Sequence, residues 1–318
     1  MPAVTAEQQD DATSPTPPVE ASAGPGSELS NTSLLAEVLA RLPAGEAVTH
    51  IRPSGGRLGL DLKELWDYRE LVYFLFMRKI KADHRQMALG PLWLILRPVL
   101  SAVLYTLIFG TLAKLPSGNL PYALYNFSAV VLWTFFTASV VGASTSLLEN
   151  RQLLGKVYFP RIVIPVVAVL SSLFTFGISF VILILVAIGF GYPPTPMLLL
   201  VPIYVLLTGL IALGIGLWFA PWVVHYRDVA NLLDYGLLAY MYLCPIVYAI
   251  EGFVPAKYET LYRLNPMTNA IQGFRWCLLG EGDPPGALLA LSFALALPLV
   301  LSGVLTFRRA VRSIVDVA

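Results

Sequence analysis

The side chains that could bind phosphate do not form a nucleotide-binding motif. Gly155-Lys156 is the only Gly-Lys pair in the chain. A phosphate loop needs Ser or Thr directly after that lysine, where this chain has Val157. It also needs a glycine five positions before Gly155, where this chain has Asn150. The three histidines and two cysteines are scattered rather than clustered, which favours neither a metal site nor a redox site. We therefore predict no catalytic residue, no metal and no cofactor on this chain.

Aromatic residues and one arginine could bind a substrate instead. Sugars can stack their C–H faces on aromatic rings, although interfacial belts and ordinary helix packing would place the same rings in a membrane protein. Both interpretations stay open for the aromatic candidates, which are Tyr105, Phe109, Tyr125, Trp133, Phe136, Tyr235 and Tyr242. Arg97 could bind a lipid phosphate through its planar guanidinium, or extend toward lipid headgroups.

The elements that carry these residues are apolar. Of the 318 residues, 57% are hydrophobic and 13% are charged, against about 25% charged in an ordinary soluble domain. The net charge of +1 gives no reason to expect nucleic acid as a partner. About 20 apolar residues cross a bilayer as a helix, and this predicts an all-α membrane protein with six spans, at 92–115, 122–148, 162–190, 197–224, 232–250 and 287–307.

Three further segments are not spans. Residues 1–60 are rich in Pro, Ser and acidic residues and are expected to form a disordered tail before a single membrane domain, 61–318. Residues 62–79 alternate apolar and charged positions, which predicts an amphipathic helix at the interface. Residues 251–280, between the fifth and sixth spans, are predicted to form a re-entrant helical hairpin, with Pro255, Tyr258, Tyr262 and Pro266 as gate candidates.

Lys and Arg concentrate in the connections on one side of the predicted spans. Arg78, Lys79, Arg151 and Lys156 lie on this side, and the positive-inside rule therefore places both termini in the cytoplasm. The predicted spans are poor in ionisable residues, which argues against an ion-coupled carrier and against a membrane enzyme that uses carboxylates or histidines.

Four motifs in order resemble those of ABC-2 type polysaccharide and polyol-phosphate export permeases, the transmembrane subunits of O-antigen, teichoic acid or capsule exporters. The resemblance covers about 61–312. The motifs are Arg78-Lys79-Ile80-Lys81 through Leu89-Gly90-Pro91-Leu92-Trp93 to Arg97-Pro98; Gly155-Lys156-Val157-Tyr158-Phe159-Pro160-Arg161; Tyr226-Arg227-Asp228-Val229; and Leu264-Asn265-Pro266-Met267.

This resemblance implies a homodimer in the bacterial inner membrane, paired with two separate ATPase subunits that bind ATP and Mg²⁺. The substrate would be a polyprenyl-pyrophosphate-linked glycan, as in lipopolysaccharide biosynthesis. The loop 149–161 would couple to the ATPase, although its basic residues could instead anchor the loop, and Arg227 and Asp228 could pair with each other. The candidates for coupling are Glu149, Arg151, Leu153, Leu154, Lys156, Tyr158, Arg227 and Asp228.

Three other functions are compatible with parts of the pattern. An ABC-2 permease for a small drug or a lipid would share the fold and need no continuous channel. A membrane enzyme acting on a lipid-linked sugar and a non-catalytic scaffold are the alternatives from other classes.

Overall fold

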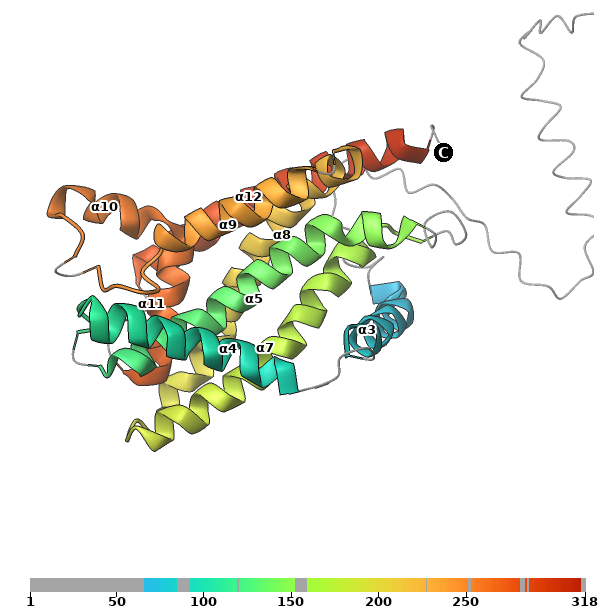
Figure 1. The fold of residues 1–318 in the computed structure, drawn as a ribbon. Coiled ribbons are helices and arrows are strands. Elements are labelled where there is room, and N and C mark those ends of the chain that lie inside the picture. Colours follow the sequence, from blue (N-terminus) through green and yellow to red (C-terminus); the bar gives the residue numbers. More distant parts are fainter. Residues whose placement is uncertain are drawn as a thin grey trace, which may run out of the picture. The chain divides into compact units, whose positions relative to one another are not determined.

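The computed structural model describes residues 66–84, 92–118, 120–151, 159–226, 228–250, 253–280, 284 and 286–315. They belong to a unit that spans Leu58–Ala318, and their regular elements are all helices (Figure 1). The predicted tail, 1–60, lies outside the described residues.

Four helices are long and apolar enough to cross a membrane. They are α5 (Tyr122–Glu149), α7 (Val163–Gly189), α8 (Val201–His225, preceded by the 3₁₀ turn η2, Pro196–Leu200) and α12 (Ala287–Val315). Their positions agree with four of the predicted spans, because each is a continuous apolar run bounded by breakers or charges. The total of six spans stays a prediction.

Glycines allow α8 to lie close to both of its neighbours. A Cβ atom on Gly216 would come within 2.5 Å of the Cβ of Ala143 in α5. On the other side, a Cβ on Gly303 of α12 would come within 2.7 Å of the carbonyl oxygen of Gly214. Small residues permit such close approach, and dispersion contacts between backbones then stabilise the packing of helices within a membrane.

The first predicted span, 92–115, contains an α-helix followed by a π-helix. It begins as α4 (Leu92–Tyr105) and continues as η1, a π-helix over Thr106–Leu112. Pro98 lies within α4 and lacks the N–H that an α-helical hydrogen bond needs. The helical path ends close to the predicted limit, since Lys114 has a left-handed φ of 52°.

The fifth predicted span, 232–250, differs from the structure at its second half. Helix α9 covers Asp228–Tyr242, and irregular backbone follows. Pro245 cannot donate the helical hydrogen bond. Side chains from α5 bind carbonyl oxygens of the irregular segment: Tyr122 donates to Val247 at 2.5 Å and Tyr125 to Tyr248 at 2.9 Å. These bonds satisfy backbone groups that helix formation would otherwise have paired.

Two short helices occupy the region between α9 and α12. Helix α10 (Ala256–Leu264) and helix α11 (Pro266–Leu279) meet at Asn265, whose side chain caps α11 by accepting from the Met267 N–H at 3.0 Å. Gly280 ends α11 with φ 71°, a conformation that glycine adopts without strain. A helical pair is present where the hairpin was predicted, and its re-entrant depth stays a prediction.

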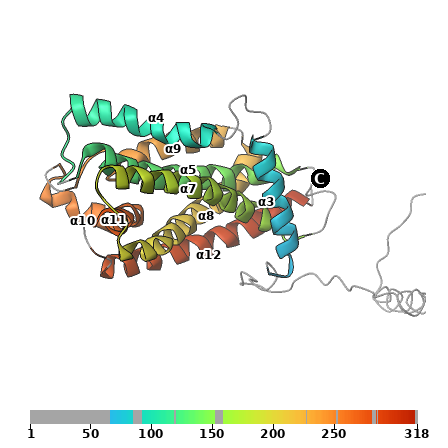
Figure 2. The same cartoon turned by 90° about the horizontal axis from the view of Figure 1, so that it is seen from below.

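Helix α3 (Arg69–His84) runs across the direction of the long helices (Figures 1 and 2). Leu75 is buried with Phe159 and Val163, so one face of α3 packs on the beginning of α7. Tyr73 and Phe74 stay exposed on α3. A helix is thus present from Arg69, within the predicted segment 62–79, and it continues to His84. Residues 62–65 lie outside the described residues, and the interfacial, amphipathic character of the helix stays a prediction.

Candidate functional site

Charged side chains link α3 to the end of α5. Arg78 donates to the Asn150 side chain at 3.2 Å, and the Lys79 ammonium lies 3.4 Å from the Glu149 carboxylate. Thr145 donates to the same carboxylate at 2.7 Å, which orients it. These contacts hold the transverse helix against a long one, and we call them the α3–α5 link.

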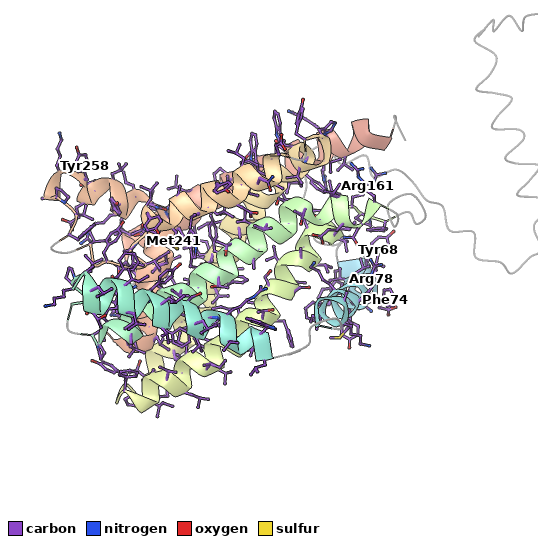
Figure 3. The ribbon with its side chains drawn as sticks, viewed as in Figure 1. Tyr68, Phe74, Arg78, Arg161, Met241 and Tyr258 are labelled. Atoms are coloured by element: carbon purple, nitrogen blue, oxygen red, sulfur yellow. The ribbon has the colours of Figure 1, made fainter. Side chains whose placement is uncertain are left out.

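Two further arginines bind carbonyl groups near the last turns of the long helices. Arg151 donates to Val224 of α8 at 3.2 Å, and Arg161 donates to Val311 of α12 at 2.9 Å. Cations are favoured there because helix C-termini carry unpaired carbonyls and a partial negative charge. Figure 3 shows Arg78 and Arg161 near the same end, opposite Tyr258 of α10. Basic residues therefore gather at one end of the helices, as the sequence indicated.

The predicted coupling residues are only partly placed by these contacts. Glu149 and Arg151 belong to this end, and Asp228 begins α9. A pocket of about 170 Å³ beside the α3–α5 link is lined by Arg78, Lys79 and Glu149. Five candidates lie outside the described residues: Leu153, Leu154, Lys156, Tyr158 and Arg227.

A second pocket, of about 250 Å³, lies between α4, α5 and α9, and we call it the α4–α5–α9 pocket. Its walls include two of the predicted aromatic residues, Tyr105 and Trp133. Asp234 of α9 also lines it, although the sequence pattern did not single this residue out. A charge inside the predicted span 232–250 was the available signal, since such charges are costly and mark functional sites.

The other aromatic candidates have different environments. Phe109 is half-buried and lies 6.1 Å from the Tyr105 ring, measured between centroids. Phe136 is fully buried and packs between Trp133 and Tyr240 at 5.1 and 6.1 Å. Tyr235 and Tyr242 on α9 are 73% and 49% exposed, respectively. Whether any of these rings contacts a substrate stays a prediction.

Arg97 lies on the exposed surface of α4, four residues before Ser101, which lines the α4–α5–α9 pocket. In a helix this spacing places the two residues on one face, about 6 Å apart along the axis. The predicted phosphate ligand is therefore next to the pocket on the same helix.

Among the described residues, Arg275 of α11 is the largest buried polar side chain, and the sequence did not identify it. Only 2% of it is exposed. Its guanidinium lies 3.5 Å from the centroid of the Tyr125 ring and donates to the carbonyls of Tyr125 and Pro245, at 3.2 and 3.1 Å. Gln272 and Ser128 accept two further bonds, at 3.2 and 3.4 Å. From the sequence alone this arginine resembled an ordinary loop charge.

Of the gate candidates, Tyr262 contacts the irregular segment that Arg275 binds, and Tyr258 lies at the surface. Tyr262 of α10 makes a hydrogen bond of 3.1 Å with Tyr248, while Tyr258 is half exposed beside Lys257. Pro255 precedes α10 and Pro266 begins α11, where a missing N–H costs nothing. The irregular segment after α9 is thus joined to α5, α10 and α11.

Comparison with known proteins identifies the family. The family model of the ABC-2 type transporter matches residues 70–279, which is well over half of the chain. An O-antigen export system permease protein RfbA from Myxococcus xanthus is 28% identical over 239 residues, covering 74% of this chain and 91% of that protein. Two proteins of the same name from Klebsiella pneumoniae are 27% and 26% identical, each covering 65% of this chain and 79% of its own length. Together with the apolar helices, these matches show that the chain is a multi-pass membrane permease and belongs to the ABC-2 type transporter family.

Proposed function

We propose that this permease exports an O-antigen-like, polyprenyl-pyrophosphate-linked glycan across a bacterial inner membrane, driven by ATP that separate subunits hydrolyse. The observation that carries the proposal is the similarity to proteins named O-antigen export permeases, one of which is matched over 91% of its length. The described residues contribute a pocket with sugar-compatible rings, Tyr105 and Trp133, which is consistent with a glycan substrate.

The charged end supports one orientation in the membrane. Arg78, Arg151 and Arg161 bind groups at one end of the long helices, so that end faces the cytoplasm together with both termini. Tyr73 and Phe74 are exposed on α3, and Trp66 is exposed three residues before it. Helix α3 runs across the direction of the long helices, and such aromatic residues favour the headgroup region. Helix α3 would then lie along the cytoplasmic interface.

Coupling would pass through the same end. A displacement of the loop 149–161 by an ATPase subunit pulls on Glu149 and Arg151, which are bound to Lys79 of α3 and to the Val224 carbonyl of α8. The force would therefore reach the transverse helix and two long helices together. Each contact alone is a surface interaction of about 1 kcal/mol or less, so transmission depends on several of them acting in parallel.

A homodimer would cover the apolar surface that one chain leaves exposed. Leu104 and Leu107 on the α4 path and Leu232 and Leu238 on α9 are each about half exposed or more. Lipid can cover such surfaces as well, so the exposure supports a dimer without requiring it. In a dimer that uses these faces, the α4–α5–α9 pocket of each chain would open toward the other.

The re-entrant hairpin would form the outer end of the pathway. Helices α10 and α11 are too short to cross a bilayer, and irregular backbone at membrane depth needs internal hydrogen-bond partners. Tyr122, Tyr125 and Arg275 supply such partners to residues 245–248. This agrees with a segment that is buried in protein rather than exposed to lipid.

The test is purification of the tagged full-length chain from its native membrane in mild detergent, followed by mass spectrometry. We expect a stoichiometric ATPase subunit and a glycan-bearing polyprenyl lipid. A cross-linker on Lys156 should capture the ATPase, while the same reagent on Lys257 of α10, at the other end, should not. Recovery of an ATPase with a small lipid or drug-like molecule would favour the alternative ABC-2 permease, and absence of any ATPase would refute the coupling.

A further inference from the structure

We infer that Asp234 and the hydroxyl groups of the α4–α5–α9 pocket form a subsite for one sugar unit of the exported glycan. The inference rests on the proposed function and adds a residue-level site to it. The polar walls of the pocket come from three helices: Ser101 of α4, Thr134 and Thr137 of α5, and Asp234 of α9.

Asp234 is an exposed residue of α9 that also lines the pocket. Its neighbours on α9, Tyr235 and Leu238, are large apolar residues that are mostly exposed. Among the described residues Asp234 has no hydrogen-bond or ion-pair partner, and a carboxylate facing lipid in such surroundings would be costly. A carboxylate that lines a pocket can instead be solvated by water or by a polar ligand.

The pocket presents mainly hydrogen-bond acceptors. The Thr134 hydroxyl donates to the Val130 carbonyl at 2.8 Å, and the Thr137 hydroxyl donates to the Trp133 carbonyl at 3.1 Å. Their protons are therefore engaged within α5, and their oxygen lone pairs remain as acceptors. The ionised Asp234 side chain only accepts. The complementary ligand is rich in donors, which is the character of a sugar with several hydroxyl groups.

The aromatic walls of the pocket fit the C–H faces of a sugar. Tyr105 and Trp133 add apolar surface beside the polar groups, and sugars combine hydroxyl edges with C–H faces that fit such a surface. Hydrogen bonds from hydroxyls to a carboxylate are charge-assisted and stronger than neutral ones.

Size and position fit one sugar next to a phosphate. The volume of about 250 Å³ is below the roughly 300–1,000 Å³ of pockets for drug-sized ligands, so the pocket suits a single ring. Arg97 lies one helical turn from Ser101 on α4. A pyrophosphate bound at Arg97 would therefore present its attached sugar to Asp234, with the polyprenyl chain left in the bilayer.

The experiment measures binding of two probes to the full-length chain in lipid nanodiscs. One probe is undecaprenyl pyrophosphate, and the other is the same lipid carrying N-acetylglucosamine. If the subsite exists, Asp234→Asn should lower the affinity for the sugar-bearing probe by about tenfold or more, the size of one lost charge-assisted hydrogen bond. The affinity for the sugar-free probe should not change. Thr134→Val should lower the affinity for the sugar-bearing probe by a few-fold and should not change the affinity for the sugar-free probe.

The matched control is Asp67→Asn, which removes an exposed carboxylate from the beginning of the α3 region and should change neither affinity. Thermal unfolding of each variant shows whether it folds. If Asp234→Asn does not fold, Thr134→Val still tests the subsite. The subsite is overturned if Asp234→Asn affects both probes equally or neither. If wild-type protein binds neither probe, the proposed function itself fails, which is a distinguishable result.

Discussion

Replacing the buried Arg275 should open the irregular segment that follows α9. This arginine donates to the carbonyls of Tyr125 and Pro245 and lies over the Tyr125 ring. Two hydrogen bonds from a charged donor contribute about 1.5–3 kcal/mol each, and a desolvated cation–π contact contributes about 2 kcal/mol. The gross loss in Arg275→Met is therefore about 5–8 kcal/mol.

Part of this loss is offset because methionine removes the cost of burying a charge. That cost is several kcal/mol for a guanidinium that has no carboxylate partner among the described residues. We expect a net loss of about 3 kcal/mol, with two carbonyls left unpaired. Since 1.4 kcal/mol corresponds to tenfold, the open form of the segment should become about 100-fold more populated.

The native cysteines report this opening directly. Cys244 and Cys277 are the only two cysteines in the chain, and both are fully buried. In a Cys277→Ala background, the rate of maleimide labelling of Cys244 follows the open population when closing is fast. The rate should rise about 100-fold in Arg275→Met.

Arg263→Met is the matched control, because Arg263 pairs with Glu259 across one turn at the surface. Such exposed pairs contribute about 0–1 kcal/mol, so labelling of Cys244 should change by less than about fivefold. Equal labelling rates in Arg275→Met and wild type would refute the assignment of a stabilising role to the buried arginine.

Three further changes test the packing and the contacts at each end. Gly303→Leu should prevent folding, because the added side chain pushes α12 away from α8. The control is Gly177→Leu, whose added side chain meets open space and which should elute normally in size-exclusion chromatography. Normal elution of both variants would contradict the close packing of α8 and α12. Lys79→Glu and Glu149→Lys should each reduce export, and the double variant should restore it because the ion pair is re-formed with its charges exchanged. If the double variant exports no more glycan than either single variant, the ion pair has no role in coupling. Asn265→Ala should cost about 1–2 kcal/mol through the lost cap and the lost bond from Tyr240, whereas Asn265→Asp should keep both. Thermal unfolding measures the difference, and equal stability of the two variants would exclude the capping role.

The long helices could be predicted because hydropathy alone defines them. Residues of α7 and α8 form apolar runs that end at breakers, and no distant contact is needed to place them. The break after Tyr242 could not be predicted in this way. Residues 243–250 are apolar, and the donors that satisfy their carbonyls come from Tyr122, Tyr125 and Arg275, which are distant in sequence.

The candidate site was predictable in its aromatic part and not in its polar part. Tyr105 and Trp133 were chosen for the chemistry of their rings, and the structure brings them to one pocket. Asp234 was overlooked because counting apolar residues hides a single charge within a span. Arg275 was overlooked because a basic residue between two spans is usually an exposed loop residue, and only tertiary packing shows that it is buried.

The packing of α9 connects the pocket to the buried arginine. Its buried residues are Leu233, Leu237 and Met241, a single stripe at a spacing of four, so the helix rests on the bundle along a narrow line. Its last turns are held by Tyr240, which donates to Asn265 at 2.7 Å, and by the Arg275 bond to Pro245. Asp234 in the pocket and Tyr240 at the hairpin thus lie on the same helix, which fixes the position of one relative to the other.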